Sequence, residues 1–197
     1  MDPIVYIHGA NATNHSFNFI APNINAPAAY VSYDAHTPLR DIIAEAAEAI
    51  KAIGPCHVVA HSMGGIIALG ALQHLPTTVH SLTTMSTPFG GVESASTISL
   101  MLPFNRFFQN INPANQLLAT IRRQGSPVPM LNIITNGGGS GLMNEANDGV
   151  VTVRSQQSVL VGPSVEHVLV GLNHFEVLLS DDILMTINEF IATHTPQ

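Results

Sequence analysis

The fold of this chain is decided by the sequence Ala60-His61-Ser62-Met63-Gly64-Gly65. An apolar run over residues 56–59 precedes it, and a second apolar run over residues 66–72 follows it. A serine between small residues, where a strand gives way to a helix, is typical of a nucleophile elbow. The helix directs the positive end of its dipole toward charge that develops near the serine. We therefore interpret Ser62 as a nucleophile rather than as part of a plain glycine loop.

Length and composition indicate a globular protein. The chain has 197 residues, of which 46% are hydrophobic and 10% are charged, and this predicts one domain over residues 1–197 with a sizeable core. The net charge is −7 with only six Lys and Arg. Binding to nucleic acid requires a clustered basic face, so we expect no nucleic-acid partner.

The single cysteine and the N-terminal sequence limit the cellular setting. Cys56 stands alone, which excludes an internal disulfide and a cysteine-based zinc cluster. We expect neither a metal nor another cofactor. No apolar stretch reaches the ~18 to 20 residues of a membrane-spanning helix. The sequence passes from Met1 almost directly into a strand, without the pattern of a signal peptide. This predicts a cytoplasmic protein, or a secreted one whose signal peptide is absent from the sequence.

Strand and helix patterns alternate along the chain. Short apolar runs predict strands over residues 4–7, 30–33, 57–60, 79–85, 130–135 and 167–171. Such continuous runs belong in a parallel sheet that is covered on both faces. Helical periodicity predicts helices over residues 38–53, 66–75 and 183–192. This succession predicts a three-layer, doubly wound α/β fold with a mostly parallel sheet.

A serine nucleophile needs a histidine base, and in proteins with this elbow the base follows later in the chain. His167 falls inside the sixth predicted strand, where its ring would point into packed helices, and His194 lies in the C-terminal tail. His174 stands just past that strand, at the carboxyl edge of the sheet, where ligands bind in open α/β sheets. We therefore expect His174 to be the general base.

The acid that orients the histidine should lie between the serine and the histidine. Four acids do so: Glu93, Glu145, Asp148 and Glu166. Asp148 follows the fifth strand and a glycine-rich loop, so it can accept the Nδ1 proton of His174 and fix its tautomer. The structural alternative is an ordinary Asp-Gly turn. Asp34, after the second strand, is the second candidate for the acid.

Two backbone N–H groups are expected to form an oxyanion hole, because such donors need little reorganisation when charge appears. One belongs to Met63, the residue after the nucleophile. The other should come from the loop after the first strand, residues 8–11, and we assign it to Ala10.

Together these motifs resemble those of small bacterial lipases and esterases of the α/β-hydrolase superfamily. The resemblance is carried by the His8-Gly9 loop, residues 60–65, Ser86-Thr87-Pro88-Phe89-Gly90-Gly91, Asn147-Asp148-Gly149-Val150-Val151 and Asn173-His174-Phe175. It covers nearly the whole chain. It implies a triad of Ser62, Asp148 and His174, an oxyanion hole of Ala10 and Met63, and hydrolysis of carboxylic esters.

Two features depart from the family pattern. Ala60 replaces the first glycine of the elbow and is still small enough for the turn. The chain also begins at what would be the third strand of the family. The resemblance therefore implies a reduced α/β-hydrolase fold of about six strands.

Residues 90–125 do not fit the alternation of strands and helices. Leu, Met and Phe are concentrated between Ile98 and Phe108. Hydrolases of this type carry cap insertions at this place, so the segment is a candidate cap, with Phe104 and Phe107 as an apolar wall for the acyl group. The alternative is a further core helix, which we favour for residues 117–121.

The substrate is expected to be a neutral or apolar small-molecule ester or a lipid, because no cationic cluster lies near the inferred site. The same triad would also serve a thioesterase, a lactonase, or a cofactor-free acyltransferase or perhydrolase. A non-catalytic binding protein with a hydrolase-like fold is a further alternative, and the intact triad argues against it.

Overall fold

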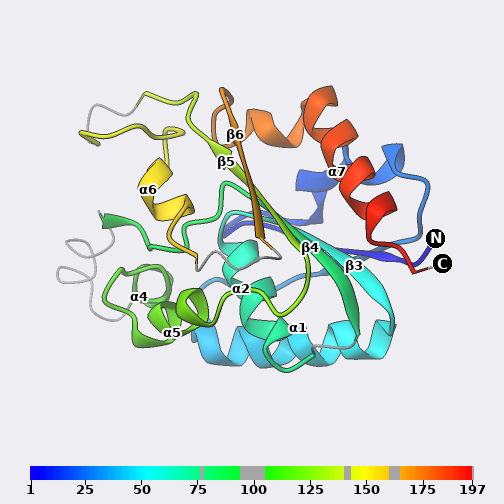
Figure 1. Ribbon diagram of the computed structural model, residues 1–197. Coiled ribbons are helices and arrows are strands. Elements are labelled where there is room, and N and C mark those ends of the chain that lie inside the picture. Colours follow the sequence, from blue (N-terminus) through cyan, green and yellow to red (C-terminus); the bar gives the residue numbers. More distant parts are fainter. Residues whose placement is uncertain (76–77, 94–104, 140–142, 160–164, 197) are drawn as a thin grey trace.

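Six parallel strands form one sheet in the computed structural model, which describes residues 1–75, 78–93, 105–139, 143–159 and 165–196. The strand order is β2-β1-β3-β4-β5-β6 (Figure 1). The strands are β1 (Ile4–Ile7), β2 (Ala28–Val31), β3 (Cys56–His61), β4 (Val79–Met85), β5 (Met130–Thr135) and β6 (Val165–Val170). All five neighbouring pairs are parallel, which confirms the predicted sheet.

Helices cover both faces of the sheet, as the prediction of three layers requires (Figure 1). The α-helices are α1 (Leu39–Ile53), α2 (Met63–Leu72), α4 (Arg106–Asn110), α5 (Gln116–Gln124), α6 (Val153–Gln156) and α7 (Asp181–Thr193). Within the residues that the structure describes, the 3-10 helices are η1 (Asn14–Phe17), η2 (Ala21–Asn23) and η3 (Glu176–Leu178). In the described part of the chain, no helix is long and apolar enough to cross a membrane.

The core consists of two apolar clusters, one on each face of the sheet. Val5 and Ile7 of β1 point to the cluster that contains the buried sides of α1, α2 and α5. Ile4 and Tyr6, the alternate residues, point to the cluster that contains η1, η2 and α7. This alternation follows from the two-residue period of a strand. The sheet is therefore buried on both sides at its centre.

The two edge strands are less buried than predicted. Exposed or half-exposed residues make up most of β2 and all of β6. His167 of β6 is half-buried, and its Nδ1 lies 3.2 Å from the side-chain amide nitrogen of Asn132. An edge strand has a neighbour on one side only, so its apolar runs are only partly covered.

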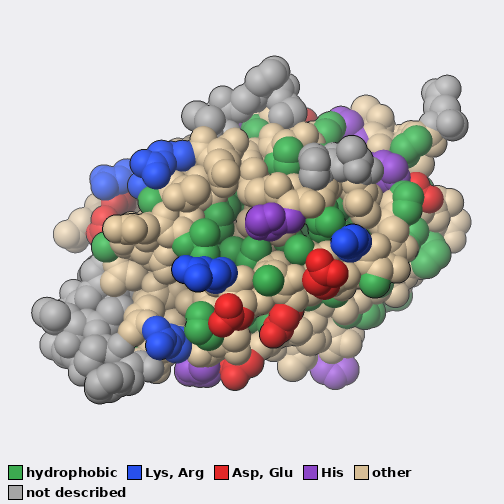
Figure 2. Space-filling view, turned by 90° about the horizontal axis from the view of Figure 1, so that it is seen from below, with side chains coloured by type: hydrophobic (Ala, Val, Ile, Leu, Met, Phe, Trp, Pro, Cys, Tyr) green, Lys and Arg blue, Asp and Glu red, His purple; other side chains and the backbone are tan. Residues whose placement is uncertain are grey.

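Helix α1 matches its predicted amphipathic pattern. All six predicted core positions are buried: Leu39, Ile42, Ile43, Ala46, Ala47 and Ile50. Asp41, Glu45 and Glu48 on its other face are exposed. Figure 2 views the molecule from the side that lies lowest in Figure 1, where α1 runs, and charged side chains of both signs alternate there with hydrophobic ones. The outer face of α1 is thus a mixed, solvated surface.

Pairing with β1 sets the position of β2, two residues earlier than the predicted strand over 30–33. Ile4 pairs with Ala28, and Ile7 pairs with Val31. Tyr33 lies past the strand, and its hydroxyl donates a hydrogen bond to the backbone oxygen of His8 at 3.0 Å. The tyrosine therefore supports the loop after β1 instead of extending the sheet.

Helix α2 begins at Met63, three residues before the predicted start, so Gly64 and Gly65 form its first turn. A Cβ atom on Gly64 would lie 2.3 Å from the backbone oxygen of Ile7. A Cβ atom on Gly65 would lie 2.1 Å from Oγ1 of Thr87. Only glycine permits these approaches, and they bring the start of α2 directly against β1 and the turn after β4.

We predict that Gly64→Ala lowers the free energy of unfolding by roughly 1–3 kcal/mol, because the new methyl group would displace backbone. Gly70→Ala is a matched control in the same helix. Its Cβ would meet Cδ1 of Ile43 at 2.6 Å, which is the end of a flexible side chain. The higher helix propensity of alanine, about 1 kcal/mol over glycine, should offset that contact. Urea unfolding measures both variants, and equal losses would contradict the close-approach explanation.

Candidate active site

Ser62 occupies a strained turn between β3 and α2. Its φ is 54° and its ψ is −128°, a backbone conformation that residues other than glycine rarely adopt. The turn is held from one side by a hydrogen bond from the N–H of Ser62 to the backbone oxygen of Met85 at 2.8 Å. Strain of this kind is found at functional sites whose surroundings impose it. This geometry is that of the predicted elbow.

The structure brings the three residues predicted for the triad together. Nε2 of His174 lies 3.0 Å from Oγ of Ser62. Nδ1 of the same ring lies 2.8 Å from Oδ2 of Asp148. A carboxylate only accepts hydrogen bonds, so Nδ1 carries the proton and Nε2 presents its lone pair to the serine hydroxyl. His174 is 3% exposed and Asp148 is 1% exposed.

The carboxylate of Asp148 is held by donors on both oxygens. The N–H groups of Val150 and Val151 donate to Oδ1 at 2.9 and 2.7 Å. Thr135 donates its hydroxyl to Oδ2 at 2.7 Å, beside His174. Burial alone would raise the pKa of Asp148, but the contacts with His174, Thr135 and Val151 hold it below the usual value. The buried carboxyl group is therefore ionised at neutral pH.

A buried glutamine completes this arrangement, and neither it nor Thr135 was found from the sequence. Gln156 accepts the N–H of Thr135 through Oε1 at 2.8 Å and donates to the backbone oxygen of Thr135 at 2.9 Å. Its Nε2 also lies 3.4 Å from Oδ2 of Asp148. A polar residue that ends an apolar strand was the available signal for Thr135. Gln156 lies in a four-residue helix with no distinctive local pattern.

A small, mostly apolar cavity of about 170 Å³ opens at Ser62. It is lined by Gly9, Ala10, Ala12, Ser16, His61, Ser62, Met63, Pro88, Val92, Phe107, Ile111, Val150, Val151, His174, Phe175 and Leu178. Ala10 and Met63 thus both border the cavity beside the serine. Phe107 is also part of the wall, whereas Phe104 lies outside the described residues.

The loop that carries Ala10 is fixed by His8 and Tyr33. Their rings stack with centroids 4.7 Å apart, and Nδ1 of His8 donates to the backbone oxygen of Gly9 at 2.7 Å. Asp34, the second candidate acid, is exposed and accepts the N–H of His36 at 2.9 Å. Its carboxylate belongs to a local turn and is not among the groups bonded to His174.

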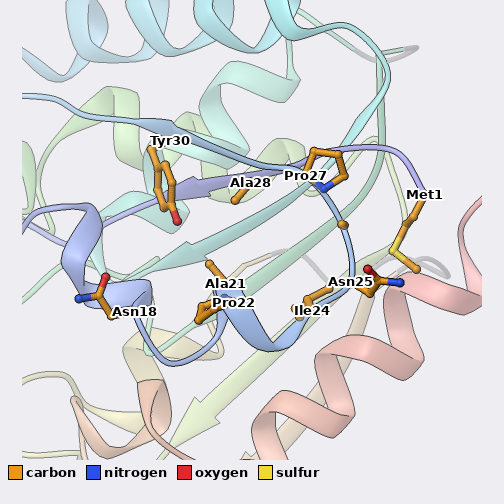
Figure 3. Close-up of a pocket in the computed structure, with 10 residues that line it drawn as sticks. Met1, Asn18, Ala21, Pro22, Ile24, Asn25, Pro27, Ala28 and Tyr30 are labelled. Atoms are coloured by element: carbon orange, nitrogen blue, oxygen red, sulfur yellow. The ribbon is translucent and has the colours of Figure 1, made fainter.

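A larger hollow of about 890 Å³ lies beside β2 and η2 (Figure 3). It is lined by Met1, Asn18, Ala21, Pro22, Ile24, Asn25, Ala26, Pro27, Ala28 and Tyr30. These lining residues include amides and one phenol but no nucleophile next to a base. Ser62 and His174, which do lie within hydrogen-bond distance of each other, border the smaller cavity.

A doubly wound parallel sheet with a serine on a strained strand-to-helix turn defines the α/β-hydrolase class of fold. Comparison with protein families agrees, since the pattern of the alpha/beta hydrolase family matches residues 4–131. The chain therefore belongs to the α/β hydrolase family. No protein with a curated description matches the sequence significantly.

Solved structures share this fold at low sequence identity. A mature lipase of Bacillus licheniformis is 19% identical with a TM-score of 0.75, and the match covers 99% of this chain and 92% of the lipase. Lipase B of Aspergillus fumigatus is 14% identical with a TM-score of 0.75, with coverage of 99% and 53%. An N-formylmaleamic acid deformylase of Pseudomonas putida S16 is 12% identical with a TM-score of 0.66, with coverage of 94% and 90%. These likenesses establish the fold alone.

Two histidines of β3 are buried. His57 is 0% exposed and His61 is 3% exposed. Burial, together with the neighbouring His80, lowers the pKa of His57 to about 4. Burial, together with His174, lowers the pKa of His61 to about 3. Both rings are therefore neutral in the folded protein at neutral pH.

We predict that these two histidines make the protein less stable in mild acid. In the unfolded chain they would bind protons near pH 6.5, well above their folded pKa values. Burial of the two neutral rings contributes fully to the free energy of unfolding above pH 6.5. This contribution is lost as the pH falls toward 4 for His57 and toward 3 for His61. At pH 5.5 each should cost roughly 1.4 kcal/mol of unfolding free energy. Urea unfolding at pH 7.5 and 5.5 measures the loss of unfolding free energy. The His57→Gln variant should lose less unfolding free energy between the two pH values than the unmodified protein does. An unchanged difference in that variant would contradict the assignment.

Proposed function

We propose that this chain is a serine hydrolase that cleaves carboxylic esters. Ser62 is the nucleophile, His174 the general base, and Asp148 the acid that orients the base. The observation that carries the proposal is the hydrogen-bonded series from Oγ of Ser62 through both ring nitrogens of His174 to Asp148. Family membership and the two lipases that share the fold support the same reaction class.

Acylation begins when the hydroxyl of Ser62 gives its proton to Nε2 of His174 as Oγ attacks the ester carbonyl. The imidazolium formed is stabilised by the ionised Asp148. The oxyanion is held by the N–H groups of Ala10 and Met63. When the tetrahedral intermediate collapses, the C–O bond to the alcohol breaks, and His174 returns the proton to the departing alcohol oxygen.

Deacylation uses the same groups with water as the nucleophile. His174 takes a proton from a water molecule as the water oxygen attacks the acyl carbon. When the bond between the acyl carbon and Oγ of Ser62 breaks, His174 gives that proton to Oγ. The N–H of Met63 is suited to the oxyanion because the first N–H groups of a helix have no partner within it. The dipole of α2 adds positive potential at the same point.

The cavity favours a neutral, apolar acyl group. Its lining includes Val92, Phe107, Ile111 and Leu178, and none of its described lining residues is Lys or Arg. A phosphate or carboxylate placed there would lose its hydration without gaining a cationic partner. A small-molecule ester or a lipid ester is therefore the substrate class.

We further propose that residues 1–197 form one hydrolase domain in which residues 90–125 are an insertion beside the site. The described part of this insertion contributes in three ways. The side chain of Asn110 at the end of α4 accepts the N–H of Leu39 and donates to the backbone oxygens of Ala35 and Thr37. Leu118 and Ile121 of α5 are buried in the core, in agreement with the packing expected for residues 117–121. Among the described residues, Phe107 carries the role of acyl wall.

We predict that a fluorophosphonate labels the native protein once, at Ser62, and that short p-nitrophenyl esters are hydrolysed. Ser62→Ala and His174→Ala should each abolish most of kcat, and the double variant should be little worse, because the triad acts as a unit. Asp148→Asn should lose activity by up to ~10⁴-fold. Mass spectrometry of the labelled peptide and initial rates provide the two measurements.

Asp34→Asn is the matched control for the acid, and it should keep normal activity. A folded protein that is not labelled, or is labelled elsewhere, would overturn the assignment of Ser62. Preferred transfer of the acyl group to an added alcohol or peroxide would instead define an acyltransferase or a perhydrolase. A non-catalytic protein would give neither label nor turnover.

We also predict that Phe107→Ala changes the preference for acyl chain length. Burial of each methylene group of the acyl chain is worth ~0.8 kcal/mol, so kcat/KM should fall more for long acyl esters than for short ones when the phenyl ring is removed. Phe108→Ala is the matched control, since Phe108 neighbours Phe107 in α4 but is not among the residues that line the cavity. It should lower thermal stability and leave the ratio of long to short esters unchanged. Equal ratios in the two variants would contradict the acyl-wall role.

A further inference from the structure

His61 joins the nucleophile to the base, although neither the triad nor the oxyanion hole includes it. It is the last residue of β3 and directly precedes Ser62. Its ring lies against the ring of His174, with centroids 4.9 Å apart. It also borders the cavity beneath the loop of Gly9. The side chain is therefore in contact with three parts of the site.

In the described part of the chain, the ring of His61 makes one hydrogen bond. Nε2 lies 2.8 Å from the backbone oxygen of His174. Because a carbonyl oxygen only accepts, Nε2 carries the proton and Nδ1 carries a lone pair. Within the described residues, Nδ1 has no hydrogen-bond partner. It faces Gly9, where an added Cβ would lie only 3.1 Å away.

A second buried histidine on the same strand shows how a purely structural ring is accommodated. His57 and His61 are four residues apart, so they lie on the same face of β3. Both ring nitrogens of His57 have partners, Oγ of Ser81 at 2.8 Å and Oγ1 of Thr195 at 3.3 Å. A buried acceptor without a partner costs free energy that an apolar side chain at position 61 would avoid. What the imidazole of His61 supplies in return is its single N–H donor.

The N–H of the His61 ring provides one of two hydrogen bonds that hold the backbone of His174 in place. The N–H of His174 donates to the backbone oxygen of Asp148 at 3.0 Å, and its carbonyl accepts from His61. The base is thus held from one side by the loop of the acid and from the other by the strand of the nucleophile. Since His61 and Ser62 are consecutive, this bond fixes the distance between the base and the serine.

We propose that His61 is a positioning residue that holds Nε2 of His174 within reach of Oγ of Ser62. The inference rests on the proposed function, because it concerns the same serine and histidine. His61 acts through His174 and takes no part in proton transfer. Its loss should therefore reduce kcat, with little effect on substrate binding.

Two amide substitutions separate the donor from other properties of the ring. In His61→Gln the amide nitrogen lies about as far along the side chain as Nε2 and can still reach the carbonyl of His174. In His61→Asn the amide lies level with Nδ1, next to Gly9, and cannot reach it. We expect His61→Gln to keep kcat within ~3-fold and His61→Asn to lower kcat about 10- to 100-fold, as loss of a positioning hydrogen bond does. KM for a short ester should change by less than about twofold in both, because Met63 and the apolar lining of the cavity remain.

The coupling to His174 distinguishes positioning from a general structural effect. In a His174→Ala background, His61→Asn should not lower the residual rate of fluorophosphonate labelling further. His57→Asn, at the other end of the same strand face, is the matched control and should lower the melting temperature without lowering kcat. If the Asn variant does not fold, His61→Phe keeps an aromatic ring without the donor and should show the same loss of kcat.

The proposal is overturned if the Asn or Phe variant keeps the kcat of the unmodified protein, or if Gln and Asn lose equal activity. It is also overturned if His61→Asn slows labelling by the same factor with and without His174. Failure of the proposed function has a different signature, since the unmodified protein would then take up no fluorophosphonate at Ser62.

Discussion

The contact between the first turn of α2 and the carboxyl end of β1 is the constraint on which the site depends. At Gly64 the helix lies so close to the backbone oxygen of Ile7 that no side chain fits between them. The chain must therefore reverse within one residue, which gives Ser62 its φ of 54°. This turn lifts the serine hydroxyl clear of the sheet and leaves the first N–H groups of the helix beside it. Packing in the core thus determines the position of the nucleophile.

Asp148 extends this arrangement to the other half of the sheet. Its carboxylate accepts from Thr135 at the end of β5, and its backbone oxygen accepts the N–H of His174 after β6. One residue therefore fixes both the ring and the backbone of the histidine. Because the carboxylate is buried, each of its donors is worth more than it would be in water. Asp148 and His174 are consequently bonded to each other through both side chain and backbone beside Ser62.

Some element bounds were predictable from the sequence, and those set by tertiary contacts were not. Strand β1 begins and ends where predicted, because its four apolar residues are limited by Pro3 and by His8-Gly9. Strands β4 and β5 also begin and end where predicted. The position of β2 depends on its pairing with β1, which no local pattern encodes. Ser62, Asp148 and His174 could be selected by their order and their positions after strands. The hydrogen bonds that connect Thr135, Gln156 and His61 to the site are not encoded by a local sequence pattern, so their roles required the structure.

Three residues at the carboxyl edge of the sheet have features that cost stability. Ser62 has a strained backbone, Asp148 is an ionised carboxylate in the interior, and His61 has a buried nitrogen without a partner in the described structure. Each of these would lower stability on its own. At the opposite edge, His57 has partners on both ring nitrogens, so the same residue type is accommodated without that cost. Local departures from the most stable arrangement are expected where a site must be held in a reactive geometry, and the two apolar clusters supply the stability that tolerates them.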